Sequence, residues 1–185
     1  MDDLSLHVLD ILENSTAAGA TEIEVRINED IDENLFTIEI EDNGKGMDQL
    51  NLSQSRDPFF TTKDTRRVGL GLSMLAQACG EAGGNLEIRS EPGRGTVIKA
   101  SFVYRHIDRK PLGSMAETIA ALIAGSAGAV RLVYRHCRGN REFIFDTAEI
   151  TKTLDGVAIN HPEILSFIKE AIESGLESLS ERSNG

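Results

Sequence analysis

Asp42-Asn43-Gly44-Lys45-Gly46-Met47 is the stretch that decides the fold, because four other motifs stand around it in a recognisable order. On its own, Asp-Asn-Gly is an ordinary turn signal. Here Glu13-Asn14-Ser15 precedes it, and three motifs follow: Asp57–Lys63 (DPFFTTK), Gly69–Leu72 (GLGL) and Gly93–Thr96 (GRGT). The chain has no G-x-x-x-x-G-K-[ST] loop, so the set predicts a nucleotide site that holds phosphate in another way.

A helix is predicted upstream of this stretch, with its end at Gly19. Its apolar stripe, at helical spacing, comprises Leu4, Val8, Ile11, Leu12 and Ser15. His7, Asp10 and Asn14 stand on a different face of the same helix, so a polar row lies beside the buried one.

Strands are predicted where apolar and polar residues alternate, over 23–27, 36–40, 86–90 and 96–104. A second helix is predicted from Gly69 to the break at Gly83-Gly84. An antiparallel sheet with one face covered by helices is a two-layer α/β sandwich, which places the chain in the α+β class.

The rest of the chain is predicted to be a small α/β extension. A first domain is expected over 1–104, and the extension over 111–180. Ser114 and Glu117 form a capping box for a helix, two alternating runs flank a hairpin turn at 138–140, and Pro162 begins an amphipathic helix. This extension is expected to serve in docking or in dimerisation, or else to cover an edge or face of the sheet.

Composition excludes several classes of function. With a net charge of -11, the chain lacks the basic surface that nucleic acids and anionic membranes require. Two cysteines are too few for a disulfide framework, and no apolar run is long enough to span a membrane. A cytoplasmic protein is expected.

Residues 1–104 resemble the ATPase domain shared by sensor histidine kinases, gyrases, Hsp90-type chaperones and mismatch-repair ATPases, the GHKL superfamily with the Bergerat fold. The helix around Asp10, Asn14 and Ser15 is similar to that of mismatch-repair ATPases, whereas 57–63 and 69–72 resemble histidine kinases. The resemblance implies ATP and Mg²⁺ as cofactors. No phosphoacceptor dimerisation helices precede the domain, so a stand-alone ATPase domain is expected.

The resemblance implies a role for each motif. Asp42 would accept the exocyclic amine of adenine, and Asn14 would offer its amide oxygen to Mg²⁺. Asp10 stands where the hydrolytic members carry a glutamate that acts as general base, with a side chain one methylene shorter. The other positions that the resemblance assigns to the nucleotide pocket are Gly44, Gly46, Met47, Phe60, Thr61, Lys63, Gly69, Leu70, Gly71, Leu72 and Thr96.

Three functions remain open on this basis. The first is a signalling kinase that passes the γ-phosphoryl of ATP to a separate protein partner. The second is a slow ATPase that acts as a conformational switch, and the third is a regulatory subunit that senses ATP over ADP without chemistry. The lid between Lys63 and Gly69 is short, which predicts weak or partner-dependent catalysis.

Overall fold

The computed structural model describes residues 3–48, 52–53 and 70–180. Its elements, in chain order, are α1 (Leu4–Ala17), β1 (Glu22–Asp30), β2 (Leu35–Asp42), α3 (Leu70–Glu81), β3 (Asn85–Glu91), β4 (Gly95–Val103), α4 (Met115–Ser126), β5 (Arg131–Arg138), β6 (Arg141–Asp146), α5 (Thr147–Thr153) and α6 (Pro162–Ser180). The helix–strand pattern confirms the predicted α+β class.

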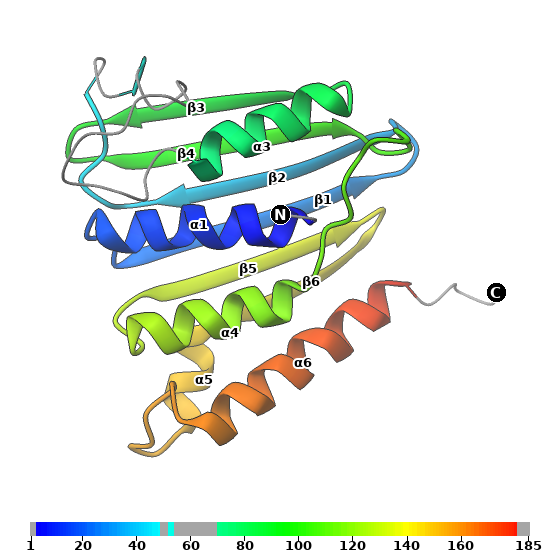
Figure 1. Cartoon of the computed structure of the whole chain (residues 1–185). Helices are drawn as coiled ribbons and strands as arrows, with labels where there is room; N and C mark the ends of the chain where they lie inside the picture. The colour runs from blue at the N-terminus through cyan, green and yellow to red at the C-terminus, as the bar shows by residue number, and fades with distance from the viewer. Residues whose placement is uncertain (1–2, 49–51, 54–69, 181–185) are drawn as a thin grey trace.

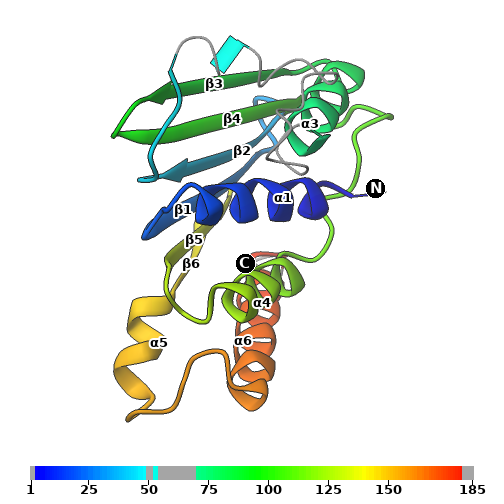
Figure 2. The ribbon, with the colours of Figure 1, turned by 60° about the vertical axis from the view of Figure 1, so that its left-hand side comes forward.

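The strands form one six-stranded sheet in the order β3-β4-β2-β1-β5-β6. All neighbouring strands are antiparallel except β1 and β5, which run parallel. Helices α1, α3 and α4 cover one face of the sheet, and α6 packs against α4 on the side away from α1 and against β6 (Figure 1, Figure 2). The result is the predicted two-layer sandwich, in which the strands of 111–180 continue the sheet of 1–104.

The sheet has one apolar and one charged face because its strands alternate. On β1, Ile23, Val25 and Ile27 are almost fully buried beneath the helices. The opposite face carries ion pairs, such as Arg26 with Glu39 at 2.6 Å and Arg135 with Glu24 at 2.8 Å.

A polar cluster at the carboxyl end of β1 links the extension to residues 1–104. His136 Nε2 on β5 lies 2.8 Å from Glu29 Oε1, and the Tyr104 hydroxyl donates to Glu29 Oε2 at 2.9 Å. Burial alone would raise the pKa of Glu29, but these two hydrogen bonds outweigh it and lower the pKa. The boundary between 1–104 and 111–180 stays a prediction, because the two parts share this sheet.

α5 was not predicted from the sequence. It is only seven residues long, and its sequence TAEITKT contains three threonines, which are weak helix formers. Asp146 begins the helix by accepting a hydrogen bond from the Ala148 amide at 2.8 Å. None of the helices that the structure describes is both long and apolar enough to cross a membrane.

His7, on α1, has a fully buried imidazole side chain. Its exposed fraction is 0%, and neither ring nitrogen has a hydrogen-bond partner among the described residues. Burial, together with the nearby Lys110 cation, lowers the pKa of His7 from 6.5, against a smaller opposing effect of Asp3. His7 is therefore neutral in the folded protein at neutral pH.

This histidine predicts acid sensitivity. Below pH 6.5 the unfolded chain binds a proton at His7 that the folded chain does not, so the free energy of unfolding falls as the pH drops through this range. Denaturant unfolding between pH 7.5 and 5 should show this loss. A His7→Leu variant should have a shallower pH dependence in the same window. An equal slope in the two proteins would contradict the assignment.

Candidate functional site

The site is built around Asp42, the last residue of β2. Its side chain is buried, with an exposed residue fraction of 8%. The Ser15 hydroxyl on α1 donates to Asp42 Oδ2 at 2.7 Å, and the Gly44 amide donates to Oδ1 at 2.9 Å. Each carboxylate oxygen has a second lone pair, so the group keeps acceptor capacity for a ligand that donates hydrogen bonds.

The loop after Asp42 is held from both sides by backbone hydrogen bonds. The Lys45 amide donates to the Ala18 carbonyl at 3.0 Å, which joins the loop to the end of α1. The Gly93 amide donates to the Lys45 carbonyl at 2.8 Å, which joins it to the β3–β4 turn. The loop is thus a fixed wall and not a free turn.

Asn43 fixes the other end of this wall. Its side-chain oxygen accepts from the amides of Thr21 at 2.9 Å and Glu22 at 3.0 Å. Its side-chain nitrogen donates to the Thr21 hydroxyl at 3.0 Å. Asn43 therefore orients the loop by satisfying the backbone at the start of β1.

Gly46 is a position where only glycine fits. Its φ is +65°, in the left-handed region. A Cβ built there would overlap the carbonyl oxygen of Glu91 and come within 2.7 Å of the Glu91 carbonyl carbon. The glycine allows the loop to lie directly against the β3–β4 hairpin.

Thr96 lies opposite Asp42 in the pairing of β2 and β4. Its Oγ1 is 2.9 Å from the Ser90 hydroxyl, which donates to the Gly95 carbonyl at 3.0 Å. The Met47 amide donates to the same Ser90 oxygen at 2.8 Å. With its one proton given to Gly95, Ser90 accepts from Met47 and from Thr96, so all of its hydrogen-bonding capacity is used.

Asp10 and Asn14 lie one turn apart on α1, and Asp10 lies beside the amino end of α3. A Cβ built on Gly71 would come within 2.8 Å of Asp10 Cβ and 3.1 Å of Asp10 Oδ2. The absence of a side chain at Gly71 therefore lets the first turn of α3 lie against Asp10. The first amides of a helix are unpaired within it and attract anions.

Asn14 is half-buried, and none of the described residues hydrogen-bonds to its side-chain amide. It stands one residue before Ser15, which contacts Asp42. The same helix therefore presents a buried link to Asp42 and an amide oxygen suited to a hard cation. Among the described residues, no group of three or more His, Cys, Asp or Glu side chains could hold a metal ion by itself.

The structure brings together most of the predicted pocket residues that it describes. Asp42, Gly44, Gly46, Met47 and Thr96 form one wall, and Asp10 and Gly71 meet where α1 lies against α3. Leu72 is buried in the core, at an exposed fraction of 5%. Its role, like that of the other predicted site residues, stays a prediction. Phe60, Thr61, Lys63, Gly69 and the Leu70 side chain lie outside the described residues.

Sequence reasoning missed three contributors to this wall: Ser15, Asn43 and Ser90. Ser15 was placed in the apolar stripe of α1, where its burial is correct but its hydrogen bond to Asp42 was not foreseen. A serine within an otherwise apolar stripe was the available signal, because a buried hydroxyl requires a partner.

Residues 2–106 match the model of a protein family described as histidine kinase-, DNA gyrase B-, and HSP90-like ATPase. The match covers more than half of the chain and includes α1 and β2 with the Asp42–Met47 loop.

The relatives with similar sequences include two sensor kinases and an anti-sigma F factor. Sensor protein kinase FleS of Pseudomonas aeruginosa is 34% identical over 116 residues, which cover 63% of this chain but only 28% of the kinase. Anti-sigma F factor of Clostridium beijerinckii is 34% identical over 108 residues, which cover 55% of this chain and 71% of that protein. Sensor kinase CckA of Brucella abortus is 38% identical over 98 residues, and the chain spans 10% of its length.

A solved structure of the N-terminal domain of a DNA repair protein has a similar fold. It aligns with a TM-score of 0.51 over 78% of this chain and 52% of that one. The sequence identity is 18%, so this likeness concerns the fold alone.

Proposed function

Because the chain belongs to the family of histidine kinase-, DNA gyrase B-, and HSP90-like ATPases, we propose that it binds ATP with Mg²⁺ at the site around Asp42 and passes the γ-phosphoryl to a protein partner. The observation that carries the proposal is the buried Asp42 carboxylate, held by Ser15 and Gly44 with acceptor capacity left over. A carboxylate at this position accepts from the amino group of adenine and repels the 6-carbonyl of guanine.

The chain's own residues suit this role. Gly46 lets the loop after Asp42 lie directly against the β3–β4 hairpin, so the wall beside the carboxylate is held in place. The amino end of α3 lies beside Asp10, and the first turn of a helix attracts phosphate oxygens, while Asn14 offers a neutral oxygen ligand to the metal. Bound Mg²⁺ supplies charge neutralisation on the phosphates during phosphoryl transfer.

The test is to incubate the purified protein with Mg²⁺ and γ-labelled ATP, with and without a lysate fraction from its native cells. The proposal expects the label on a partner protein only when the fraction is present. The kinase function is contradicted if the label reaches no protein, even though the same preparation binds ATP in a filter assay.

A slow ATPase that acts as a switch is the second candidate, and the contact between Asp10 and Gly71 favours it. Asp10 lies against the end of α3 that would face the phosphates, so its carboxylate is placed to accept a proton from an attacking water. Asp10→Asn keeps the shape of the side chain but removes its basicity. We expect phosphate release to fall by about 100-fold with ATP affinity within a few-fold of wild type. Equal turnover in the two proteins would exclude Asp10 as the base.

Asn14 gives a separate prediction about the metal. Asn14→Ala removes the one proposed protein ligand, so ATP affinity measured in Mg²⁺ should fall about tenfold. In EDTA, the affinities of the variant and of wild type for ATP should be the same. Isothermal titration calorimetry under both conditions checks this, and a loss of equal size in EDTA would show that Asn14 acts on the nucleotide or on α1 instead.

A further inference from the structure

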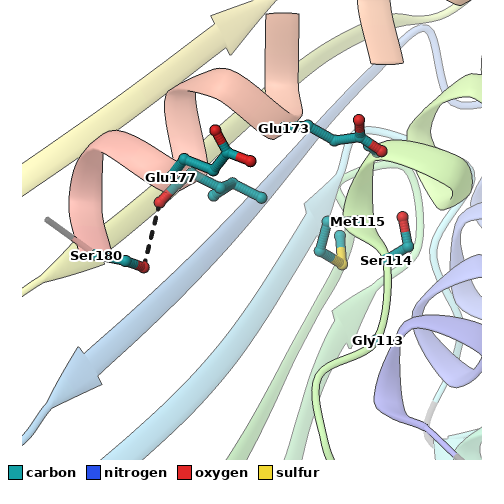
Figure 3. Close-up of a pocket in the computed structure, with 8 residues that line it drawn as sticks. Gly113, Ser114, Met115, Glu173, Glu177 and Ser180 are labelled. Atoms are coloured by element: carbon teal, nitrogen blue, oxygen red, sulfur yellow. Dashed lines mark hydrogen bonds between the residues drawn. The ribbon is translucent and has the colours of Figure 1, made fainter. Parts of the chain in front are cut away.

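A groove with a volume of about 570 Å³ lies on the extension, outside the proposed ATP site. One side is formed by 113–116, at the amino end of α4, and the other by Glu173, Leu176, Glu177 and Ser180 on α6. Figure 3 shows Ser114 and Met115 on one side and the side chains of Glu173 and Glu177 on the other. The nucleotide-binding residues proposed above are not among those that line it.

The floor and the rim of this groove differ in chemistry. Leu176 is half-buried and supplies the apolar surface of the floor, because Met115 and Ala116 are each only 1% exposed. Glu173 and Glu177 are both exposed and stand one turn apart on the same face of α6. The groove is therefore an apolar slot with a carboxylate rim.

Neither rim carboxylate has an ion-pair partner among the described residues. The nearby Lys169 on α6 is instead paired with Glu117 on α4, at 3.1 Å. Two like charges spaced by four residues on one face of a helix repel each other. The positive amino end of α4 offsets the repulsion between these two carboxylates only in part. Its partial charge is about half an elementary charge, whereas the two carboxylates carry two negative charges.

We propose that this groove docks a basic amphipathic helix of a partner protein. Such a helix would place an apolar side chain on the floor against Leu176. Lysine or arginine residues spaced by four positions would then face Glu173 and Glu177, which have the same spacing. The net charge of -11 favours the approach of a cationic partner. The proposal extends beyond nucleotide binding and does not depend on it.

The probe is a labelled 18-residue helical peptide with leucine on one face and lysine on the other, and fluorescence anisotropy measures its binding to the full chain. The groove variant carries Glu173→Gln and Glu177→Gln. A matched control carries Glu163→Gln and Glu170→Gln, which remove the same charge from exposed positions of α6 outside the groove. All four positions are exposed, so both variants should fold.

We expect the groove variant to bind the peptide about tenfold more weakly and the control to stay within twofold of wild type. Equal weakening in both variants would show non-specific attraction to an acidic protein and overturn the proposal. The proposal would also be overturned if the wild-type protein did not bind the peptide. It would be overturned, too, if sedimentation velocity showed a wild-type dimer that the groove variant alone disperses, because a second copy of the chain would then be the occupant. ATP affinity, measured in the same variants, reports separately on the proposed function.

Discussion

Asp42→Asn should weaken ATP binding by roughly 100-fold, because a buried hydrogen bond to a charged acceptor contributes about 1.5–3 kcal/mol. The variant replaces one carboxylate oxygen by an amino group, which donates where Ser15, Gly44 and, in the proposed complex, the adenine amine require an acceptor. One of these three donors then loses its partner. Calorimetric titration with ATP measures the effect.

The matched control for this variant is Asp108→Asn. Asp108 stands in the segment after β4, with 67% of its side chain exposed, so its loss of charge should leave ATP affinity within twofold of wild type. The Asp42→Asn variant should also discriminate less against GTP, because the amide oxygen accepts hydrogen bonds whereas the amide nitrogen donates them. If ATP affinity were unchanged and GTP stayed excluded, adenine recognition would lie elsewhere.

Gly46→Ala should cause the largest loss of stability of any single methyl addition in the loop. An alanine is strained in this left-handed backbone conformation. Its Cβ also overlaps the Glu91 carbonyl, so the β3–β4 hairpin has to move. The two effects together lower the free energy of unfolding by about 2–5 kcal/mol. Urea unfolding measures the loss, and ATP affinity should fall with it because the wall beside Asp42 is displaced.

Gly93→Ala separates the two causes. Gly93 also has a positive φ, of +75°, but a Cβ there would meet no atom within 4 Å. We expect this variant to lose about 1–2 kcal/mol, the backbone contribution alone. If the two glycine variants lost equal stability, the contact between the loop and the hairpin would have no energetic weight.

The local features of this chain were predictable from its sequence, and its long-range features were not. Alternation in 23–27 and 36–40 predicts β1 and β2, and helical spacing predicts α1, because each pattern reports directly on which side chains are buried. The Asp42–Met47 loop and its glycines were equally readable, since few residues accept such a backbone. The family resemblance of 1–104 is confirmed by the family match.

What the sequence did not predict are contacts between residues far apart in the chain. The hydrogen bond from Ser15 to Asp42 joins a helix to a strand end, and no local pattern encodes it. The parallel pairing of β5 with β1 joins strands that are far apart in the chain, and no property of either strand alone encodes it. The extension was therefore predicted as a separate unit, although its strands complete the sheet.

The parallel pair also affects when the sheet is completed during synthesis. Glu22 and its partner Arg131 are 109 residues apart, so β1 has no neighbour on that side until β5 has been synthesised. At ordinary rates of translation this interval lasts on the order of ten seconds. During that time β1 is an open sheet edge, and its Glu24 and Arg26 are charged side chains of the kind that oppose pairing with other strands.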